Sequence, residues 1–219
     1  MKDLVLLPGW GFDSRVWQPL TRLLDQDFRI HSASDDLPDG AVVCGWSLGA
    51  QTAMQMALAQ PGRIVRLVLI GATPRFVQAK DWPHAQPAAL LEGFATAVAA
   101  DPRAALRRFA ALLNQGDTQA RRLTRELSSV LATEASATAL AAGLQALRDT
   151  DLRADIGQIR QPVLLLHGAH DALMPLAAAE WLAKHLPDTR LEVFPDAAHA
   201  PFLAQPERCA ELLRRFAHE

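Results

Sequence analysis

The 219-residue sequence predicts an α/β fold in which helices cover both faces of a mostly parallel sheet. Two observations carry this prediction. Short, continuous apolar runs recur along the chain, and such runs are typical of strands that are buried on both faces. Segments with helical periodicity separate these runs, and strands that alternate with helices form parallel sheets through right-handed crossovers.

The predicted elements follow one another along the chain. Six runs are expected to form strands, at residues 4–7, 28–33, 41–46, 65–71, 162–168 and 190–195. Helices are expected between these strands, at about residues 16–25, 48–60, 176–185 and 206–217. The alternation of strand and helix therefore holds over most of the chain.

One long segment, residues 76–158, interrupts the alternation because it contains no convincing strand. Helical patterns are expected there instead, at about residues 87–99, 102–114, 118–131 and 134–147. The sequence thus predicts a core formed by residues 1–75 and 159–219, and an inserted helical cap formed by residues 76–158. Because ligands bind at the C-terminal ends of parallel strands, we expect the cap to cover that end of the sheet.

Composition and charge exclude several classes of partner. The formal net charge is −2, so the overall balance predicts neither a nucleic-acid partner nor a membrane-surface partner. No run approaches the roughly 20 apolar residues that span a bilayer, and no secretion-signal pattern is present at the start. Cys44 and Cys209 are expected to be reduced, buried thiols. These features predict a cytoplasmic protein. The sequence has no clustered His/Cys spacing, no G-x-G-x-x-G and no P-loop, so we expect no metal or organic cofactor.

A serine lies between two glycines in the stretch Gly45-Trp46-Ser47-Leu48-Gly49. This G-x-S-x-G pattern, placed between a predicted strand and a predicted helix, is typical of a nucleophile elbow. The strained turn requires small neighbours and lifts the serine Oγ above the sheet, where the Leu48 N–H can stabilise an oxyanion. The alternative interpretation is a glycine-rich turn whose serine only caps the helix.

A serine nucleophile needs a base, and the base needs an acid that orients it. Asp171 follows the predicted strand at 162–168, and His199 follows the predicted strand at 190–195, in the chain order of this fold. Asp171 could instead be a turn-forming residue and His199 an ordinary loop histidine. Three competitors lie nearby and rank lower as members of the catalytic set: His167, His170 and Asp196.

A second oxyanion donor is expected from the loop after the first strand, in "LLPGWGFDSRVW". Trp10 follows Gly9 in this loop, and its backbone N–H could act together with that of Leu48. The alternative interpretation of Trp10 is an aromatic packing residue. Its side chain could serve both purposes by lining the pocket.

These motifs resemble the α/β-hydrolase fold and, more narrowly, the BioH carboxylesterases, which hydrolyse the methyl ester of pimeloyl-acyl-carrier protein in biotin synthesis. The resemblance covers most of the chain and rests on "LLPGWGFDSRVW", "GWSLGA", "ATPRFVQAKDWP" with "LLEGF", "RRFAALLNQG", "DLRADIGQIRQPVLLLHGAHDALMP" and "AAHAPFLAQP". It implies a serine esterase with the triad Ser47, Asp171 and His199. It further implies oxyanion donors on the backbones of Trp10 and Leu48, and contact between Phe109 and the acyl chain.

The predicted cap is rich in arginine, at positions 103, 107, 108, 121, 122 and 125. Acyl carrier proteins are acidic, so a basic cap offers them a docking surface. The resemblance implies this role for Arg108, Arg121 and Arg125, with Arg107 a weaker candidate. The alternative is a solvated helix face. We expect a monomer or weak dimer.

The sequence leaves two further functions open. One is a small-ester esterase or a C–C bond hydrolase that uses the same triad. The other is a non-catalytic binding protein with a hydrolase fold, which an intact triad argues against.

The sequence departs from the family in four places, of which the mildest is Gly49-Ala50 where the family has Gly-Gly after the elbow. Pro8-Gly9 stands where the family has His-Gly, so a supporting side chain is lost. The chain begins at what would be the third strand of the family, so we expect the first hairpin to be absent. The link at residues 34–40 spans at most about 25 Å, which predicts an extended crossing in place of a helix. One sheet face would then be thinly covered, or covered by another subunit.

Overall fold

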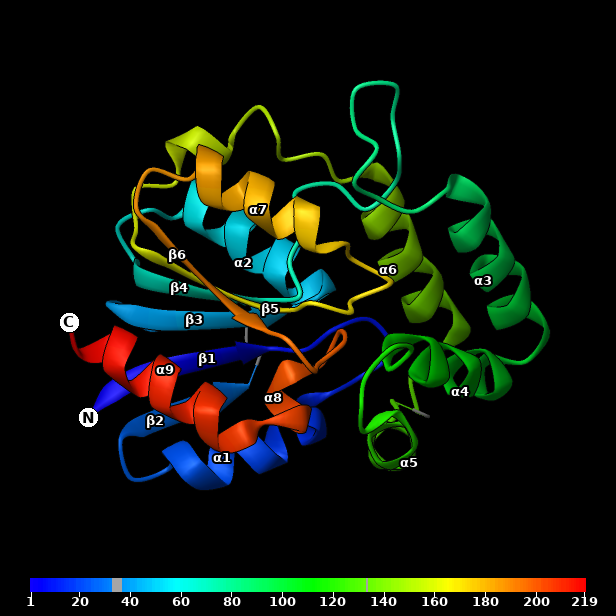
Figure 1. Cartoon of the computed structure of the whole chain (residues 1–219), viewed down its shortest axis with the longest axis horizontal. Coiled ribbons are helices and arrows are strands. Elements are labelled where there is room, and N and C mark those ends of the chain that lie inside the picture. Colours follow the sequence, from blue (N-terminus) through cyan, green and yellow to red (C-terminus); the bar gives the residue numbers. More distant parts are fainter. Residues whose placement is uncertain (33–36, 133) are drawn as a thin grey trace.

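The computed structural model of the protein describes residues 1–32, 37–132 and 134–219 (Figure 1). Its centre is a parallel sheet with the strand order β2-β1-β3-β4-β5-β6. The strands are β1 (Lys2–Leu7), β2 (Phe28–Ser32), β3 (Ala41–Trp46), β4 (Ile64–Ile70), β5 (Val163–Gly168) and β6 (Thr189–Phe194). The predicted α/β fold is confirmed, and all six strands form close to their predicted bounds.

Helices cover both faces of the sheet (Figure 1). One face carries α1 (Gln18–Leu24), the short α8 (Pro201–Ala204) and α9 (Pro206–His218), and the other carries α2 (Leu48–Ala59) and α7 (Leu176–His185). Alternate residues of a strand point to opposite faces, so Leu4 and Leu6 of β1 belong to one buried cluster and Val5 to the other. The helix expected from about residue 16 begins later, at Gln18, because a 3₁₀ turn at Ser14–Trp17 precedes it.

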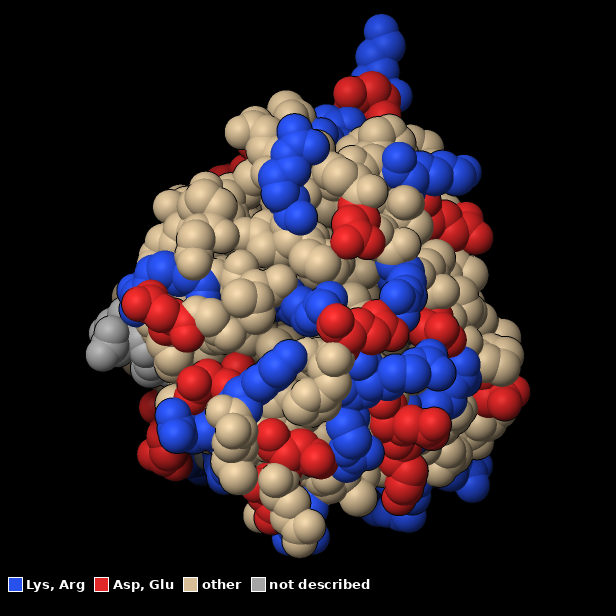
Figure 2. Space-filling view, turned by 90° about the vertical axis from the view of Figure 1, so that its left-hand side faces the viewer, with Lys and Arg blue, Asp and Glu red and all other residues tan. Residues whose placement is uncertain are grey.

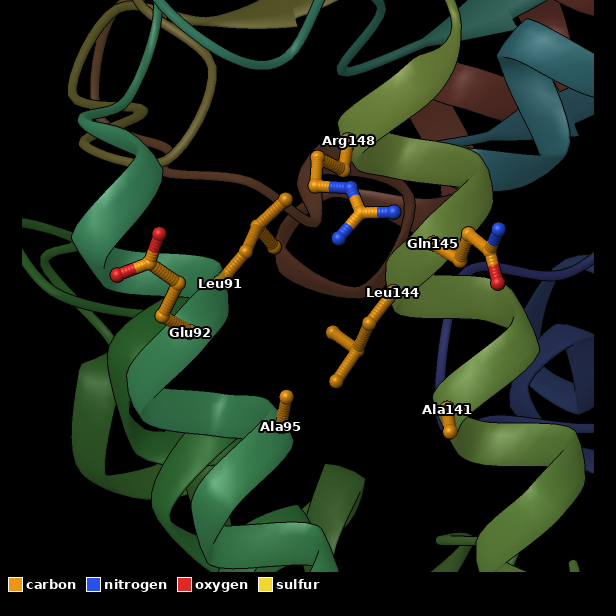
Figure 3. A pocket seen from close by; sticks show the side chains of 7 residues that line it. All are labelled: Leu91, Glu92, Ala95, Ala141, Leu144, Gln145 and Arg148. Atoms are coloured by element: carbon orange, nitrogen blue, oxygen red, sulfur yellow. The ribbon is translucent and has the colours of Figure 1, made fainter.

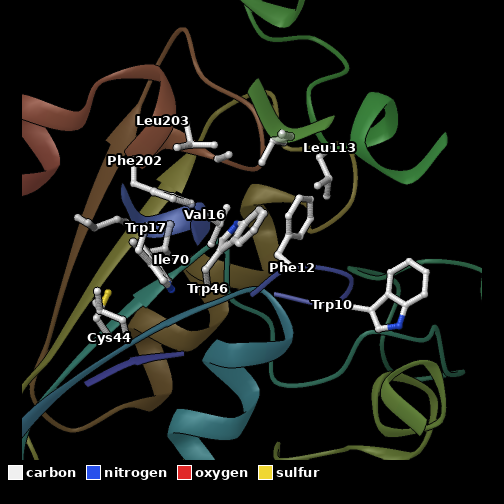
Figure 4. Packing of buried hydrophobic residues seen from close by; sticks show 14 of the residues in the cluster. Trp10, Phe12, Val16, Trp17, Cys44, Trp46, Ile70, Leu113, Phe202 and Leu203 are labelled. Carbon is white, nitrogen blue, oxygen red and sulfur yellow. The ribbon is translucent and has the colours of Figure 1, made fainter. Parts of the chain in front are cut away.

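The larger buried cluster is aromatic where it approaches the C-terminal ends of the strands (Figure 4). The rings of Trp17 and Trp46 both pack against Phe202, with centroid separations of 4.6 and 5.2 Å. Cys44 lies in the same cluster, and both Cys44 and Cys209 are buried and free. Burial raises the pKa of each thiol, and the prediction of two thiols buried in the core is confirmed.

Four helices lie between β4 and β5 in the chain and gather beyond the C-terminal ends of the strands (Figure 1). They are α3 (Ala88–Ala100), α4 (Pro102–Leu113), α5 (Ala120–Ser129) and α6 (Ala137–Asp149). The side chain of Asp101 caps α4 by accepting the N–H of Ala104 at 3.0 Å. Within the part of 76–158 that the structure describes, no segment forms a strand of the sheet.

Two of these helices begin later than predicted. The pattern predicts a helix from residue 134, but α6 begins at Ala137 because the Ser136 side chain caps it by accepting the Ala139 N–H at 3.1 Å. The pattern also predicts a helix from residue 118, but α5 begins at Ala120. A turn precedes it, in which the Asp117 carboxylate accepts the Gln119 N–H at 2.7 Å.

Residues 34–36 of the predicted extended crossing at 34–40 lie outside the described part of the chain, and residues 37–40 form neither helix nor strand. At the edge of the sheet, β2 and its neighbour β1 carry polar side chains on the face that α2 covers elsewhere. Asp3 of β1 lies 2.7 Å from the imidazole of His31 and 3.3 Å from the guanidinium of Arg29, both on β2. Polar side chains of β1 and of the edge strand β2 therefore pair with one another on this face.

The end of the molecule opposite the four inserted helices carries charges of both signs. Figure 2 shows Lys and Arg interspersed with Asp and Glu over this face. None of the helices in residues 1–32, 37–132 and 134–219 combines the length and apolar character that crossing a bilayer requires.

Candidate active site

Ser47 sits on the sharp turn between β3 and α2. Its backbone has φ 59° and ψ −120°, and it is the only described residue other than glycine with a positive φ. Such a conformation costs free energy and is typical of nucleophiles on strand-to-helix turns. The side chain makes no hydrogen bond to the first turn of α2, so the alternative in which Ser47 serves as a helix cap is wrong.

The two glycines of the turn are required by close backbone contacts. A Cβ on Gly45 would overlap the backbone carbonyl of Gly49, and a Cβ on Gly49 would overlap that of Leu7. No side chain could shift to relieve either overlap, because the obstructing atoms belong to the backbone. The G-x-S-x-G spacing is therefore a packing requirement of this turn.

His199 and Asp171 meet in the interior, as the sequence predicts. Asp171 lies in the loop after β5 and His199 in the loop after β6, and both are buried. The Nδ1 atom of His199 is 2.6 Å from Oδ2 of Asp171. The other nitrogen, Nε2, is buried and has no hydrogen-bond partner in the described structure. A neutral imidazole held through Nδ1 presents Nε2 as the basic atom.

The end of β4 brings the serine and the histidine to the same place. The carbonyl of Ile70 accepts the Ser47 N–H at 3.0 Å. The next residue, Gly71, has a φ of 53° and borders the imidazole of His199: a Cβ there would lie 2.9 Å from Nδ1. Glycine is therefore needed at position 71 for the ring to approach the strand end.

Asp171 remains ionised despite its burial. Burial raises the pKa of a carboxyl group, but the charge and hydrogen bond of His199 outweigh this effect and hold the pKa of Asp171 below its usual value. Its Oδ1 atom also accepts the backbone N–H groups of Leu173 and Met174, at 3.0 and 2.8 Å. The carboxylate can therefore orient His199 and stabilise its protonated form.

The competing residues take other roles. His167 is buried, and its Nε2 lies 2.7 Å from the Met174 carbonyl and 3.5 Å from Oδ2 of Asp171. Burial lowers the pKa of His167, so its ring is neutral and donates to that carbonyl. Asp196 contacts the inserted helices through its own backbone carbonyl, which accepts from Thr118. The structure thus pairs His199 with Asp171.

The loop after β1 passes beside the serine. A Cβ on Gly9 would lie 3.1 Å from the Cβ of Ser47, so the backbone of Trp10 follows directly next to the turn. The Trp10 side chain points into the inserted helices, where its Nε1 donates to the Leu140 carbonyl at 2.8 Å. Its ring packs edge-on against Phe109, with centroids 4.7 Å apart. Trp10 is therefore an aromatic packing residue with a backbone close to Ser47.

A narrow, enclosed cavity opens at Ser47. Apolar side chains from the β1 loop, the inserted helices and the loop after β5 line it: Trp10, Phe76, Leu90, Leu91, Phe94, Phe109, Leu144, Leu147 and Leu173. Phe109 of α4 is one of these lining residues. Such a lining suits an aliphatic chain, whose burial is favourable at about 25 cal/mol per Å².

The cavity adjoins one surface hollow that is lined by a predicted arginine, and that hollow adjoins a second one. The cavity shares Leu90 and Phe94 with the hollow that Arg108 lines. That hollow in turn shares Ala120 with another, whose lining includes three further arginines, Arg121, Arg122 and Arg125. A row of neighbouring depressions therefore runs from Ser47 to the N-terminal half of α5.

A third hollow adjoins the cavity between α3 and α6. Leu91 and Leu144 line both spaces and so form the wall between them. Figure 3 shows both leucines pointing into the gap between the two helices, with the longer polar side chains of Glu92 and Arg148 around it.

The predicted arginines differ in their surroundings. The Arg122 side chain is held by hydrogen bonds within the protein, to Glu126 at 2.9 Å and to the Leu203 carbonyl at 3.1 Å. The guanidinium of Arg108 lies 5.9 Å from the centroid of the Phe94 ring. Arg121 and Arg125 form no ion pair within the described residues, which leaves them available to an acidic surface.

Sequence reasoning missed two residues that hold the loop of His199. The Trp46 indole Nε1 donates to the His199 carbonyl at 2.8 Å, and the Asp117 carboxylate accepts the Ala198 N–H at 2.9 Å. No local pattern signals either contact. Both depend on how distant segments pack.

Comparisons with known proteins agree with this geometry. Residues 35–206 match the family described as alpha/beta hydrolase fold. An esterase structure from Exiguobacterium antarcticum superposes with a TM-score of 0.85 at 22% identity, covering 100% of this chain and 92% of that chain. An enol-lactonase structure from Burkholderia xenovorans gives 0.82 at 20% identity, with 100% and 92% covered. The fold and the site therefore define an α/β hydrolase.

Relatives in sequence place the chain in a more specific family of α/β hydrolases. A protein of Aromatoleum aromaticum named pimeloyl-[acyl-carrier protein] methyl ester esterase is 45% identical, and the alignment covers 96% of each chain. A protein of the same name from Nitrosomonas europaea is 40% identical, with 94% of this chain and 92% of that one covered. This chain belongs to the family of these esterases.

Proposed function

We propose that this protein is a serine esterase that hydrolyses the methyl ester of pimeloyl-acyl-carrier protein to the free carboxylate and methanol. The observation that carries the proposal is the row of depressions between Ser47 and the arginines of α5. To reach Ser47, an acyl chain would have to part the apolar side chains that line this narrow cavity, while its carrier stays outside. The names of the relatives from Aromatoleum and Nitrosomonas support the same substrate.

The first chemical step acylates Ser47. As Oγ of Ser47 attacks the ester carbonyl carbon, Nε2 of His199 removes its proton. Asp171, held ionised at 2.6 Å from Nδ1, stabilises the imidazolium that forms. The backbone N–H groups of Trp10 and Leu48 would donate to the oxyanion, each contributing about 2.7–4 kcal/mol of transition-state stabilisation. The C–O bond to the methoxy group then breaks, and His199 gives the proton to the leaving methanol.

The second step releases the acid. His199 removes a proton from a water molecule as the water oxygen attacks the acyl carbon. The tetrahedral intermediate collapses, the bond to Oγ of Ser47 breaks, and His199 returns the proton to Oγ. The buried, apolar walls around Ser47 limit the number of water molecules near the intermediate.

The inserted helices serve as the substrate-binding cap. We assign this role to residues 76–158, with residues 1–75 and 159–219 as the catalytic core. Phe109 of α4 lines the cavity and would contact the acyl chain. Arg108, Arg121 and Arg125 would attract the acidic carrier protein, because they surround the outer hollows and opposite charges steer association.

We further propose that the protein acts in the cytoplasm as a monomer or weak dimer. The free thiols of Cys44 and Cys209 suit a reducing compartment. Among the described residues, Met1 and Val65 are the only large hydrophobic side chains that are exposed, whereas obligate dimers usually bury a large apolar surface. Sedimentation of the purified protein at micromolar concentration would test the oligomeric state.

A turnover assay tests the reaction. Purified protein and its Ser47→Ala variant are given the methyl ester of pimeloyl-acyl-carrier protein and, separately, a short p-nitrophenyl ester. We expect the wild type to cleave both esters and the variant neither. Cleavage of the short ester alone would replace the proposal with a general esterase, and a folded wild type that cleaves neither would favour a binding protein.

Docking is tested by charge removal on α5. Arg121→Ala and Arg125→Ala are expected to raise KM for the carrier-bound ester several-fold and to leave turnover of the short ester unchanged. Arg148→Ala is the matched control, because Arg148 lies on α6 and pairs with Asp149 at 2.8 Å. Added salt should weaken carrier binding by the wild type more than by the variants. Equal KM values for the α5 variants and the control would reject this docking surface.

A further inference from the structure

The connection between α4 and α5 binds the loop that carries His199. Four hydrogen bonds join the two segments, and one of them runs from the Thr118 hydroxyl to the Asp196 carbonyl at 3.3 Å. The other three involve backbone N–H donors. The carboxylate of Asp117 accepts the Ala198 N–H at 2.9 Å, the Leu113 carbonyl accepts the His199 N–H at 3.2 Å, and the Asp196 carbonyl accepts the Thr118 N–H at 3.2 Å. The catalytic loop of the core is thus tied to the cap at the histidine and at two residues just before it.

The same connection also abuts the loop of the acid. Gly116 has a φ of 90°, and a Cβ there would lie 3.1 Å from the Cβ of His170, the residue before Asp171. The N–H of His170 donates to the Ala197 carbonyl at 3.0 Å. The connection therefore lies across the two loops that carry Asp171 and His199, where the loops themselves are hydrogen-bonded.

Asp117 is the side chain at the centre of these contacts. It is buried, and its two oxygens bind different partners, since Oδ1 accepts the Gln119 N–H at 2.7 Å and Oδ2 accepts the Ala198 N–H at 2.9 Å. A carboxylate can accept at both oxygens, whereas an amide offers one oxygen and one donor. Aspartate therefore fits this position, and asparagine would place an NH₂ group against an N–H.

We propose that Asp117 is a positioning residue for His199: from the cap, its carboxylate fixes the Ala198 peptide and thereby the imidazole one residue further on. The proposal rests on the catalytic role of His199 under the proposed function. Its physical basis is the steep dependence of rate on geometry, since a displacement of about 1 Å at a reacting group can cost about 100-fold. The base of the core would then be aligned only while the α4–α5 connection is in place.

Asp117→Asn tests the proposal on the short p-nitrophenyl ester, which needs no carrier docking. We expect kcat per folded molecule to fall about 10- to 100-fold with KM within about twofold of the wild-type value. The matched control is Asp101→Asn, which makes the same change at the N-cap of α4, where Asp101 holds Ala104 and has no hydrogen bond to the His199 loop. This control should keep the wild-type kcat.

Other outcomes separate the proposals. A lower melting temperature with unchanged kcat per folded molecule would mean that Asp117 is only structural, and would overturn the inference. If Asp117→Asn does not fold, Gly116→Ala and Thr118→Val take its place, and wild-type kcat in both folded variants would overturn it equally. Activity that survives Ser47→Ala would reject the proposed function itself, whereas an inactive Ser47→Ala beside a fully active Asp117→Asn would reject only the positioning role.

Discussion

The indole of Trp46 donates a 2.8 Å hydrogen bond to the backbone carbonyl of His199, so the residue before the proposed nucleophile holds the loop of the proposed base. This bond runs from the end of β3 to the loop after β6, past the intervening strands β4 and β5. The two rings also face each other at a tilt, with centroids 5.6 Å apart. The alignment of Ser47 and His199 thus depends on a hydrogen bond that involves neither the Ser47 side chain nor the His199 side chain.

Trp46→Phe should slow catalysis more than it weakens substrate binding. The change keeps an aromatic ring but leaves the buried His199 carbonyl without its donor, which costs about 1–3 kcal/mol of stability. We expect a several-fold lower kcat on the short ester with little change in KM. Trp17→Phe is the control, because the buried Nε1 of Trp17 has no hydrogen-bond partner to lose. Equal kcat values in the two variants would contradict the role of the Trp46 hydrogen bond.

Gly45→Ala should prevent the turn of Ser47 from forming. The added methyl group would overlap the Gly49 carbonyl. Because the backbone on both sides is rigid, we expect this overlap to lower the free energy of unfolding by about 3 kcal/mol or more. Urea unfolding and ester turnover should both show the loss. Gly93→Ala makes the same change in α3, where nothing lies within 4 Å of the new Cβ, and should stabilise the protein by about 0.5–1 kcal/mol. A stable, active Gly45→Ala would show that the turn tolerates a side chain.

Much of the fold can be predicted from the sequence because its signals are local. The strand runs, the chain order of Ser47, Asp171 and His199, and the glycines of the elbow each follow from a short pattern. The starts of α5 and α6 are less predictable, because side chains of Asp117 and Ser136 compete with the helix for the first N–H groups.

The support of the site is not local, and no pattern in the sequence reveals it. Trp46 and His199 are 153 residues apart in the chain, and Asp117 and Ala198 are 81 apart. Each of these contacts exists only after the sheet and the cap have packed. The cavity wall presents the same difficulty, because helical periodicity shows that α3 and α6 have apolar faces but does not show which leucine faces Ser47.

Leu144→Ala should widen the range of esters that the enzyme accepts. Leu144 lines both the Ser47 cavity and the hollow between α3 and α6, so its truncation would join the two spaces. We expect turnover of bulkier esters to rise relative to methyl esters, together with a stability loss of about 2–5 kcal/mol. Leu140→Ala on the same helix removes an equally buried side chain that lines neither space, and should reduce stability without changing the preference. An unchanged preference in Leu144→Ala would show that the wall does not select the substrate.

His167 should make the stability of the fold depend on pH below about 6.5. Burial lowers its pKa in the folded state, with Asp171 opposing this effect only in part, whereas the unfolded chain titrates near the usual value of about 6.5. At pH values between the folded-state and unfolded-state pKa of His167, the unfolded chain binds more protons than the folded protein. The free energy of unfolding is therefore highest above about pH 6.5 and falls as the pH drops, by up to about 1.4 kcal/mol per pH unit. His167→Gln should show a shallower fall as the pH drops below about 6.5, measured by urea unfolding. His185→Gln, at an exposed position on α7, is the control, and identical slopes for the wild type and His167→Gln would contradict a neutral, buried His167.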